Sequence, residues 1–198
     1  MTKDKDYQYH DDTGKLYLRH PIHTNLWLDT VTSEAYSSMR EIEIFQPWED
    51  TEQPYRLLKP YIDKEGYPRL FTHCQGRKNW IRFGRFVWEC YNQKELDDHL
   101  EIDHIDRNVQ NNDILNLRPA SRRENACNRL VTKNQYSPGK CVYRFHGKRA
   151  RKNGKNFQTQ IMVNGKMKYL GTYKTLEEAK EVYKQACMKY HGSFALWE

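Results

Sequence analysis

The residue types best suited to chemistry lie together in residues 100–130, and the first of them are an adjacent acid and imidazole, Asp103 and His104. A short β-like run, residues 100–102, precedes the pair. Because neighbouring residues of a strand point to opposite faces, both side chains can serve one site only where the strand ends or bends. We expect that break in the loop 106–116, whose asparagines suit the capture of loop backbone groups. These asparagines are Asn108, Asn111, Asn112 and Asn116.

A helix carrying two further amide side chains is expected after this loop. Residues 121–124, SRRE, have the spacing of a capping box, which puts Asn125 in the first turn and Asn128 one turn later. Asp103 and Asn125 offer hard oxygen ligands, which suit Mg²⁺ or Mn²⁺ rather than zinc. Beside such an ion, His104 can take a proton from the attacking water while the ion stabilises charge on the leaving oxygen. Asn128 either supports a ligand by hydrogen bonding or is simply solvated.

The elements that must position these residues precede them in the chain. Residues 67–72 alternate between two faces and a polar turn leads into residues 80–83, which predicts a β-hairpin. Apolar residues at helical spacing follow over residues 86–91. Further upstream, the sequence indicates only short strands around residues 16–18 and 41–45.

Residues 66–130 resemble the HNH (ββα-metal) endonucleases, in particular the free-standing and intron-encoded homing endonucleases of bacteriophages. The resemblance rests on the Asp-His pair, the NNxxxNL pattern of the loop and the capped helix together, since an Asp-His pair alone is common and usually structural. It implies Asp103 as a metal ligand, His104 as the general base and Asn116 as the central asparagine that braces the loop. It also implies products with a 3′-hydroxyl and a 5′-phosphate.

Two positions depart from the commonest pattern of these enzymes. Asn125 stands where many members have a third histidine, although some phage homing enzymes have asparagine there. The helix before the motif often starts with a histidine in such enzymes, and here Gly84-Arg85 occupies that position.

The charge of the chain changes sign along its length. Residues 1–117 carry 15 Lys/Arg and 21 Asp/Glu, a balance of −6, whereas residues 118–198 carry 18 and 5, a balance of +13. No acidic residue lies between Asn125 and Leu176. So dense a field of one sign needs a polyanion, and nucleic acid is the usual partner. A solubilising surface or a disordered basic tail is the alternative, but the interleaved aromatic residues argue against disorder.

Composition limits the setting in which the protein acts. Its 198 residues allow one ordinary domain or two small ones. No apolar run approaches the length of a membrane span and the first residues lack a secretory signal, so no membrane partner is expected. The cysteines are odd in number and widely spaced, which predicts reduced thiols in a cytoplasmic protein, in the host cytoplasm if a phage encodes it. They are Cys74, Cys90, Cys127, Cys141 and Cys187.

A minimal two-layer domain is expected at the C-terminal end. Three β-like segments are followed by one amphipathic helix, a combination that can bury a small core. Asn164-Gly165 is a strong signal for a two-residue hairpin turn. Thr175 and Glu178 form a capping box at the helix start, and Gly192 ends the helix. The β-like segments are residues 142–145, 157–163 and 166–170.

Residues 141–195 resemble the ethylene-response-factor (Apetala-two-like) DNA-binding domain of plant transcription factors, which is also attached to phage HNH nucleases. The resemblance rests on VYRF, FQTQIMVNGK, YLGTY, LEEAKEVYKQA and KYHGSFA. In that family the sheet enters the major groove and the helix packs behind it. Odd-numbered residues of 157–163 are then expected to face the helix with Leu170, and the even-numbered ones to face outward with Met167 and Tyr169. The residues expected to read bases or contact phosphates are Arg144, Arg149, Arg151, Gln158, Gln160, Lys166, Lys168 and Tyr169.

The predicted fold class is α+β: a ββα-metal HNH nuclease module followed by a three-stranded antiparallel sheet packed on one helix. The predicted divisions are an N-terminal region of unclear role (1–65), the nuclease module (66–131), a linker (132–140) and the Apetala-two-like domain (141–198).

The predicted function is that of a metal-dependent DNA endonuclease. It would use one Mg²⁺ or Mn²⁺ per site on double-stranded DNA, as a monomer or weak dimer. The first alternative is a DNA-binding regulator whose HNH fold has lost activity. An RNA-directed nuclease fits less well, because a three-stranded major-groove reader suits B-form DNA better than the deep, narrow groove of RNA.

Overall fold

The computed structural model describes residues 8–10, 14–38, 55–74, 77–129, 140–145 and 152–196. The chain divides into two compact units, Met1–Ser121 and Arg122–Glu198, and each is described by itself. The division falls after Ser121, so the helix that carries Asn125 belongs to the second unit. Of the predicted linker, only Lys140 lies within the described residues. No helix in these ranges is both long and apolar enough to cross a membrane.

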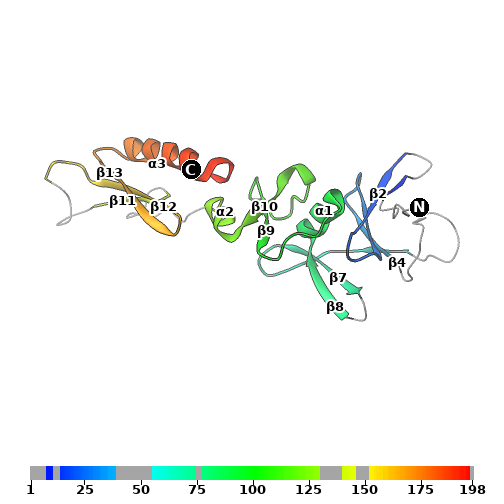
Figure 1. The fold of residues 1–198 in the computed structure, drawn as a ribbon. Helices are drawn as coiled ribbons and strands as arrows, with labels where there is room; N and C mark the ends of the chain where they lie inside the picture. Colours follow the sequence, from blue (N-terminus) through cyan, green and yellow to red (C-terminus); the bar gives the residue numbers. More distant parts are fainter. Residues whose placement is uncertain are drawn as a thin grey trace. The chain divides into compact units, whose positions relative to one another are not determined.

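The first unit begins with a five-stranded antiparallel sheet whose strands follow one another in sequence order (Figure 1). All four residues of the central strand are buried. Leu26 and Leu28 point into the main core, and Trp27 points to the other face, where it packs with Tyr17. One predicted short strand is β2; the other, residues 41–45, lies outside the described residues. The strands are β1 (Gln8–His10), β2 (Leu16–Arg19), β3 (Leu26–Asp29), β4 (Ala35–Ser38) and β5 (Tyr55–Leu58).

A second sheet and a helix complete the core of this unit. The sheet consists of β6 (Tyr61–Ile62), β7 (Pro68–Cys74) and β8 (Arg77–Arg82), and it leads into α1 (Phe83–Asn92). β7 and β8 form the predicted hairpin, in which alternate residues of β7 are buried. The core residues Leu70 and Phe86 cluster with Leu26 and Leu28 of the first sheet. The N-terminal region, to which the sequence assigned no function, therefore shares one core with the hairpin and α1.

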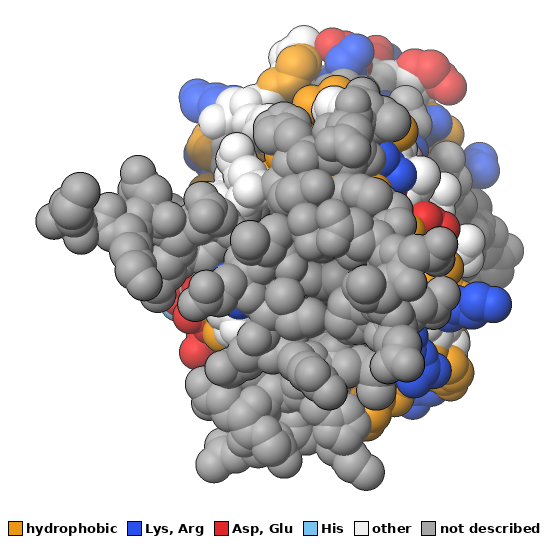
Figure 2. All heavy atoms as spheres, turned by 90° about the vertical axis from the view of Figure 1, so that its right-hand side faces the viewer, with side chains coloured by type: hydrophobic (Ala, Val, Ile, Leu, Met, Phe, Trp, Pro, Cys, Tyr) orange, Lys and Arg blue, Asp and Glu red, His pale blue; other side chains and the backbone are white. Residues whose placement is uncertain are grey.

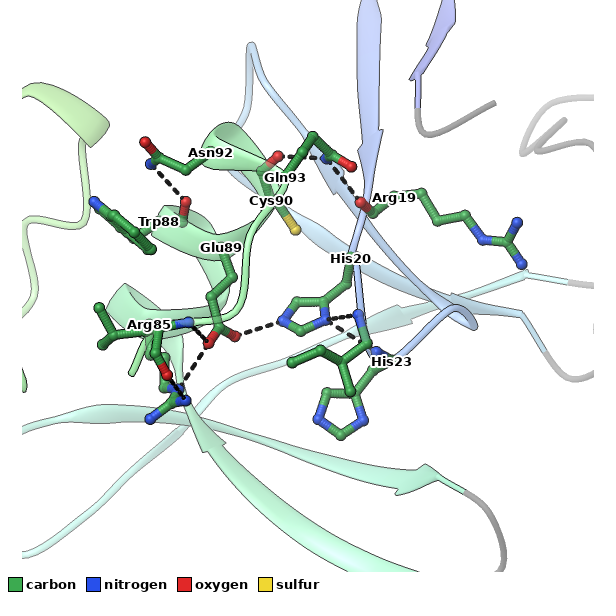
Figure 3. A network of polar contacts seen from close by, with 11 residues as sticks. Arg19, His20, His23, Arg85, Trp88, Glu89, Cys90, Asn92 and Gln93 are labelled. Carbon is green, nitrogen blue, oxygen red and sulfur yellow. Dashed lines mark hydrogen bonds and ion pairs between the residues drawn. The ribbon is translucent and has the colours of Figure 1, made fainter. Parts of the chain in front are cut away.

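A buried histidine joins the first sheet to α1 (Figure 3). His20 follows β2, and its Nδ1 accepts hydrogen bonds from the backbone N–H groups of Ile22, at 3.2 Å, and His23, at 3.0 Å. The proton of the neutral ring is therefore on Nε2, which donates to Glu89 Oε2 at 2.8 Å. The ring also stacks on Phe86 with 5.5 Å between centroids. This contact fixes the N-terminal sheet against the helix.

Glu89 is the centre of the same network on the side of α1. Its Oε1 accepts from Leu96 N at 2.8 Å and from Arg85 Nε at 2.9 Å. Burial works to raise the pKa of Glu89, but the hydrogen bonds from His20 and Leu96 and the charge of Arg85 outweigh it and hold that pKa below its ordinary value. Breaking a buried pair of this kind typically costs about 3–5 kcal/mol, because the remaining partner is left unsatisfied.

The motif predicted to carry the chemistry lies on the last elements of the first unit and the first helix of the second. β9 (Leu100–His104) and β10 (Leu117–Ser121) form an antiparallel pair, and the loop between them ends in the 3₁₀ turn η1 (Ile114–Asn116). α2 (Arg122–Cys127) begins directly after Ser121, as the capping-box spacing predicted.

The second unit contains a three-stranded antiparallel sheet and a long helix. β11 (Val142–Arg144), β12 (Phe157–Val163) and β13 (Lys166–Tyr173) lie in that order and precede α3 (Leu176–His191) and the 3₁₀ turn η3 (Gly192–Phe194). The predicted capping box is present: Thr175 Oγ1 accepts from Glu178 N at 3.2 Å, and the Glu178 side chain accepts from Thr175 N at 3.4 Å. The buried cluster between sheet and helix comprises Ile161, Tyr183, Ala186 and Cys187.

The hairpin between β12 and β13 has the turn that its sequence predicted. Asn164 and Gly165 both have positive φ, 50° and 75°, which a two-residue turn of the primed type requires. The register shifts between Thr159 and Gln160, where Leu170 is the extra residue on β13. Leu170 packs against the buried cluster on the helix side, as expected.

Candidate active site

The acid–imidazole pair lies at the end of a strand, where the sequence placed it. Asp103 and His104 are the last two residues of β9, and both are buried, with 3% and 7% of their surfaces exposed. The chain turns immediately afterwards: Arg107 N donates to His104 O at 2.9 Å, and Arg107 has a left-handed φ of 68°. The chain therefore leaves the strand directly after the pair, and that both side chains serve one site stays a prediction.

Asp103 is held by an arginine of the neighbouring strand. Arg118 lies opposite it in the register of β9 and β10, and Arg118 Nε and Nη2 each lie 2.7 Å from Asp103 Oδ2. Paired donors from one guanidinium fix a carboxylate in orientation as well as in charge. Arg118 was not among the predicted site residues. Its cross-strand position relative to Asp103 is the signal that a correct pairing of the two strands would have supplied.

An asparagine of the loop determines which ring nitrogen of neutral His104 carries the proton. His104 Nε2 lies 3.1 Å from Asn112 Oδ1, while Asn112 Nδ2 donates to Gln110 O at 3.1 Å. Because the amide nitrogen faces Gln110, its oxygen faces the imidazole and accepts, so the proton of the neutral ring sits on Nε2. The lone pair is then on Nδ1.

A pocket of about 170 Å³ borders this histidine within the first unit. Tyr67 lies on one side, with its ring centroid 6.3 Å from that of His104, and the Arg82 guanidinium lies 4.6 Å from the Tyr67 ring centroid. Gly84 also lines the pocket, and a Cβ there would be 2.9 Å from Asn112 Oδ1 and 3.4 Å from His104 Nε2. The glycine at the position where related enzymes often have a histidine thus allows α1 to approach the imidazole and its partner closely.

Asn116 braces the loop of the motif, as the resemblance implied. Its Oδ1 accepts from Asp106 N at 2.9 Å, and its Nδ2 donates to Asp106 Oδ1 at 2.9 Å and to Asn111 O at 2.8 Å. Hydrogen bonds from the Asn111 side chain and the Asn108 backbone hold the pKa of Asp106 below its ordinary value. Asp106 is thus the acceptor around which the asparagines gather, a role that sequence reasoning missed. A part for Asn116 in the chemistry itself stays a prediction.

The donor set of the first unit suits a hard cation. Within the described ranges, no group of three or more His, Cys, Asp or Glu side chains is placed to hold a metal. Mg²⁺, however, usually keeps several waters and binds through only one or two protein carboxylates together with substrate phosphates. Asp103, a buried carboxylate next to His104, fits that pattern. That Asn125 shares the ion joins residues of the two units and stays a prediction.

The end of α2 is anchored within the second unit. Lys140 Nζ donates to Cys127 O and, at 3.0 Å, to Arg129 O, so a buried lysine satisfies carbonyls at the C-terminal end of the helix. Asn125 lies half-buried on α2, and Asn128 is buried one residue beyond its end. Plain solvation of Asn128 is therefore excluded. Its support of a metal ligand stays a prediction.

The predicted DNA-contacting residues divide between the two faces of the C-terminal sheet. Gln158, Gln160 and Tyr169 lie on the face away from α3, because Gln158 pairs with Tyr143 and Gln160 with Tyr169. Tyr169 is the most exposed of them, at 57%. Met162 and Met167 pair on the same outer face.

The remaining described basic residues lie at strand positions that point to the opposite face of the sheet, toward α3. Lys166 and Lys168 pair with Val163 and Ile161 of the helix side, and Lys168 Nζ donates to the Tyr190 hydroxyl of α3 at 2.6 Å. Arg144 pairs with Phe157 and places its guanidinium 5.5 Å from that ring. The predicted contacts Arg149 and Arg151 lie outside the described residues.

Comparison with known proteins identifies the motif. Residues 83–127 match the family model of the HNH endonucleases. The "Uncharacterized HNH endonuclease L560" of Acanthamoeba polyphaga mimivirus is 26% identical over 137 residues, which cover 69% of this chain and 65% of that protein. The chain thus spans less than two thirds of this relative's length. Residues 83–127 of this chain are therefore similar to the HNH endonuclease domain.

A solved structure is similar over about half of the chain. It is described as "DNA binding and cleavage by the HNH homing endonuclease I-HmuI" and is 21% identical in sequence, with a TM-score of 0.40. The similarity covers 56% of this chain and 55% of that one.

Proposed function

We propose that this protein is a divalent-metal-dependent DNA endonuclease of the homing type, which cleaves double-stranded DNA near a site bound by its second unit. The observation that carries the proposal is the pair at the end of β9. His104 is held by Asn112 with its lone pair on Nδ1, and the adjacent Asp103 is fixed by Arg118. An imidazole poised as a base next to a carboxylate suited to Mg²⁺ is what phosphodiester hydrolysis requires.

The chain's own residues then act as follows. His104 Nδ1 accepts a proton from water while its Nε2–H stays bonded to Asn112, so the ring becomes an imidazolium without changing orientation. The water oxygen bonds to phosphorus, the bond from phosphorus to the 3′-oxygen breaks, and that oxygen takes a proton from a solvent water. An ion of Mg²⁺ or Mn²⁺ held at Asp103 would supply the positive charge that stabilises the leaving oxygen. Arg118 keeps the carboxylate oriented.

The second unit is proposed to locate the DNA site through the outer face of its sheet. Gln158 and Gln160 present amides that can bond adenine edges, and Tyr169 adds an exposed ring beside them. Lys166, Lys168 and the other basic residues are proposed to contact phosphates from the margins of this face, since phosphate contacts set position and not sequence. The binding mode rests on the resemblance of residues 141–195 and on strand parity.

The proposed activity predicts cleavage that depends on a divalent ion. Supercoiled plasmid incubated with the full chain and Mg²⁺ should be nicked first, because a monomer carries one HNH motif, and EDTA should abolish the nicking. Mapping the ends on both strands should give 3′-hydroxyl and 5′-phosphate termini at a defined position. Intact plasmid in Mg²⁺ and in Mn²⁺, with specific DNA binding retained, would leave the inactive regulator as the correct function.

A matched pair of variants tests the proposed binding face. Gln160→Ala should weaken binding to the mapped site by about 1–3 kcal/mol and relax preference at one base pair, because it removes a bidentate base contact. Lys168→Ala should weaken binding to all sequences alike and reduce its salt dependence, because a lysine contributes only by counterion release. Affinities measured by fluorescence anisotropy over a salt series distinguish the two. Equal, sequence-independent losses would contradict base reading by Gln160.

A further inference from the structure

The outer face of the β6–β7–β8 sheet carries exposed aromatic rings next to the candidate active site. Tyr61, Phe71 and Trp80 are 59%, 39% and 49% exposed. Their rings form a row: the Tyr61 and Trp80 centroids are 5.7 Å apart, and those of Phe71 and Trp80 are 5.0 Å apart. Surface aromatics scattered singly need no explanation, but a contiguous row of three marks an interaction surface. We call these residues the aromatic row.

Strand register puts the aromatic row on the face opposite the core. Phe71 pairs with Trp80, and Leu70 pairs with Ile81, both of which are buried. Because side chains alternate between faces, the residues on either side of the buried pair point outward. The row is therefore not part of the hydrophobic core, and the described residues of this unit do not cover it.

Two arginines connect the aromatic row to the pocket beside His104. Arg69, which forms an ion pair with Asp63 at 2.6 Å, lies opposite Arg82 one step along the same face. Arg82 lies over Tyr67, which borders that pocket. A strand of nucleic acid lying along the row would thus reach His104 by way of these cations. Figure 2 shows one face of the molecule, on which described Lys and Arg side chains lie beside hydrophobic ones at the lower right, without identifying the residues.

The charge of this segment differs from that of the unit around it. Residues 55–82 contain seven Lys/Arg and two Asp/Glu, a balance of +5, whereas the rest of residues 1–117 contains eight and nineteen, a balance of −11. A hollow of about 470 Å³ beside Phe71 is lined by Arg56 and Lys59 as well as two leucines. An acidic partner protein would bind the cations without using the aromatic rings, and an apolar partner would bind the rings without using the cations. Nucleic acid can use both, since its bases stack on rings and its phosphates bind cations.

We propose that the aromatic row binds unpaired bases of the substrate by stacking, while Arg82 binds its phosphates, so that the strand to be cut is led to His104. Stacking requires bases whose faces are accessible, which points to DNA that is opened or distorted next to the cleaved bond. The inference deepens the proposed function, on which it rests.

Photo-crosslinking of the full chain in EDTA tests this surface without any cleavage. The probes are bromodeoxyuridine-containing DNAs of about thirty nucleotides, several times a single stacking site, as a fully paired duplex and as the same duplex with a central unpaired bubble. The bubble should crosslink to Trp80 or Tyr61, located by mass spectrometry, and the paired duplex should not. Crosslinks confined to the second unit would overturn the proposal.

Binding measurements test the aromatic row quantitatively. Trp80→Ala should lower affinity for the bubble about ten-fold relative to the paired duplex, and Trp80→Phe should restore most of it, because a ring is what stacking needs. Val31→Ala, which shortens an exposed side chain outside the aromatic row, should change neither affinity. Equal affinities of the wild type and Trp80→Ala for the bubble would reject the proposal. So would a dimer that Tyr61→Ala converts into a monomer, since the row would then be a subunit interface.

Failure of the aromatic-row proposal can be distinguished from failure of the proposed nuclease activity in the plasmid assay. Crosslinking at the aromatic row without cleavage would refute the nuclease and retain the surface. Metal-dependent cleavage by a Trp80→Ala protein with unchanged bubble affinity would retain the nuclease and refute the surface.

Discussion

His104→Ala should lower the rate of plasmid cleavage by about 1,000-fold and leave DNA affinity nearly unchanged. General-base catalysis contributes about 100- to 10,000-fold, and this histidine is the proposed base, which Asn112 holds with its lone pair on Nδ1. The measurement is single-turnover cleavage of a mapped duplex at saturating enzyme, together with binding in EDTA. Single-turnover conditions exclude an effect on product release.

His99→Ala provides the matched control. His99 also lies in the first unit, but its side chain is 77% exposed and it lies beside Asp97 on the surface. It should cleave at the wild-type rate. A His104→Ala enzyme that keeps its activity would reject the assignment of the base, and with it the proposed mechanism.

Gly84→Ala should lower the cleavage rate by about 10- to 100-fold while leaving the protein folded. The added Cβ would lie 2.9 Å from Asn112 Oδ1, so the buried asparagine must move and its hydrogen bond to His104 must lengthen or break. A displacement of catalytic groups by about 1 Å costs roughly this factor. In the helix itself alanine is favoured over glycine by about 1 kcal/mol, so the melting temperature should not fall in proportion to activity.

A double-mutant cycle isolates the cause of this loss. In an Asn112→Ala background the atom that the new Cβ meets is gone, so Gly84→Ala should have a much smaller additional effect on the rate. Strictly additive losses would show that Gly84 acts through some other contact. A large drop in melting temperature for the single variant would instead mean that α1 cannot accept alanine at this position.

The parts of the candidate site that depend on local sequence were predictable. Asp103 and His104 lie at the strand end because the following asparagine-rich residues favour a loop, and the resemblance to HNH endonucleases implied that Asn116 braces that loop. The hairpin, the Asn164 turn and the Thr175 cap follow in the same way from short patterns.

Contacts between distant segments were not predictable from such patterns. His20 and Glu89 are 69 positions apart, and nothing in either neighbourhood indicates the other. Predicting the ion pair between Arg118 and Asp103 requires knowledge of the register of two strands. The close approach of Gly84 to Asn112 can be recognised only when α1 is placed against the loop.

Charge and strand alternation give different expectations for the lysines of one strand. Lys166 and Lys168 were expected at DNA because they are basic, but they share parity with Leu170, so simple alternation already places them on the helix side. At these two lysines, basic charge predicts a DNA contact, whereas strand alternation predicts the face toward the helix. The contact between Lys168 and Tyr190 shows how a long side chain on that side reaches a polar partner.

The core shared by the first sheet and α1 limits how the HNH motif of this protein can be recombined with other domains. An exchange point just before the hairpin would separate β3 from Phe86 and expose two complementary apolar faces. The piece that recombination can transfer intact therefore includes residues 14–38, so the inherited unit extends well upstream of the motif by which it is recognised.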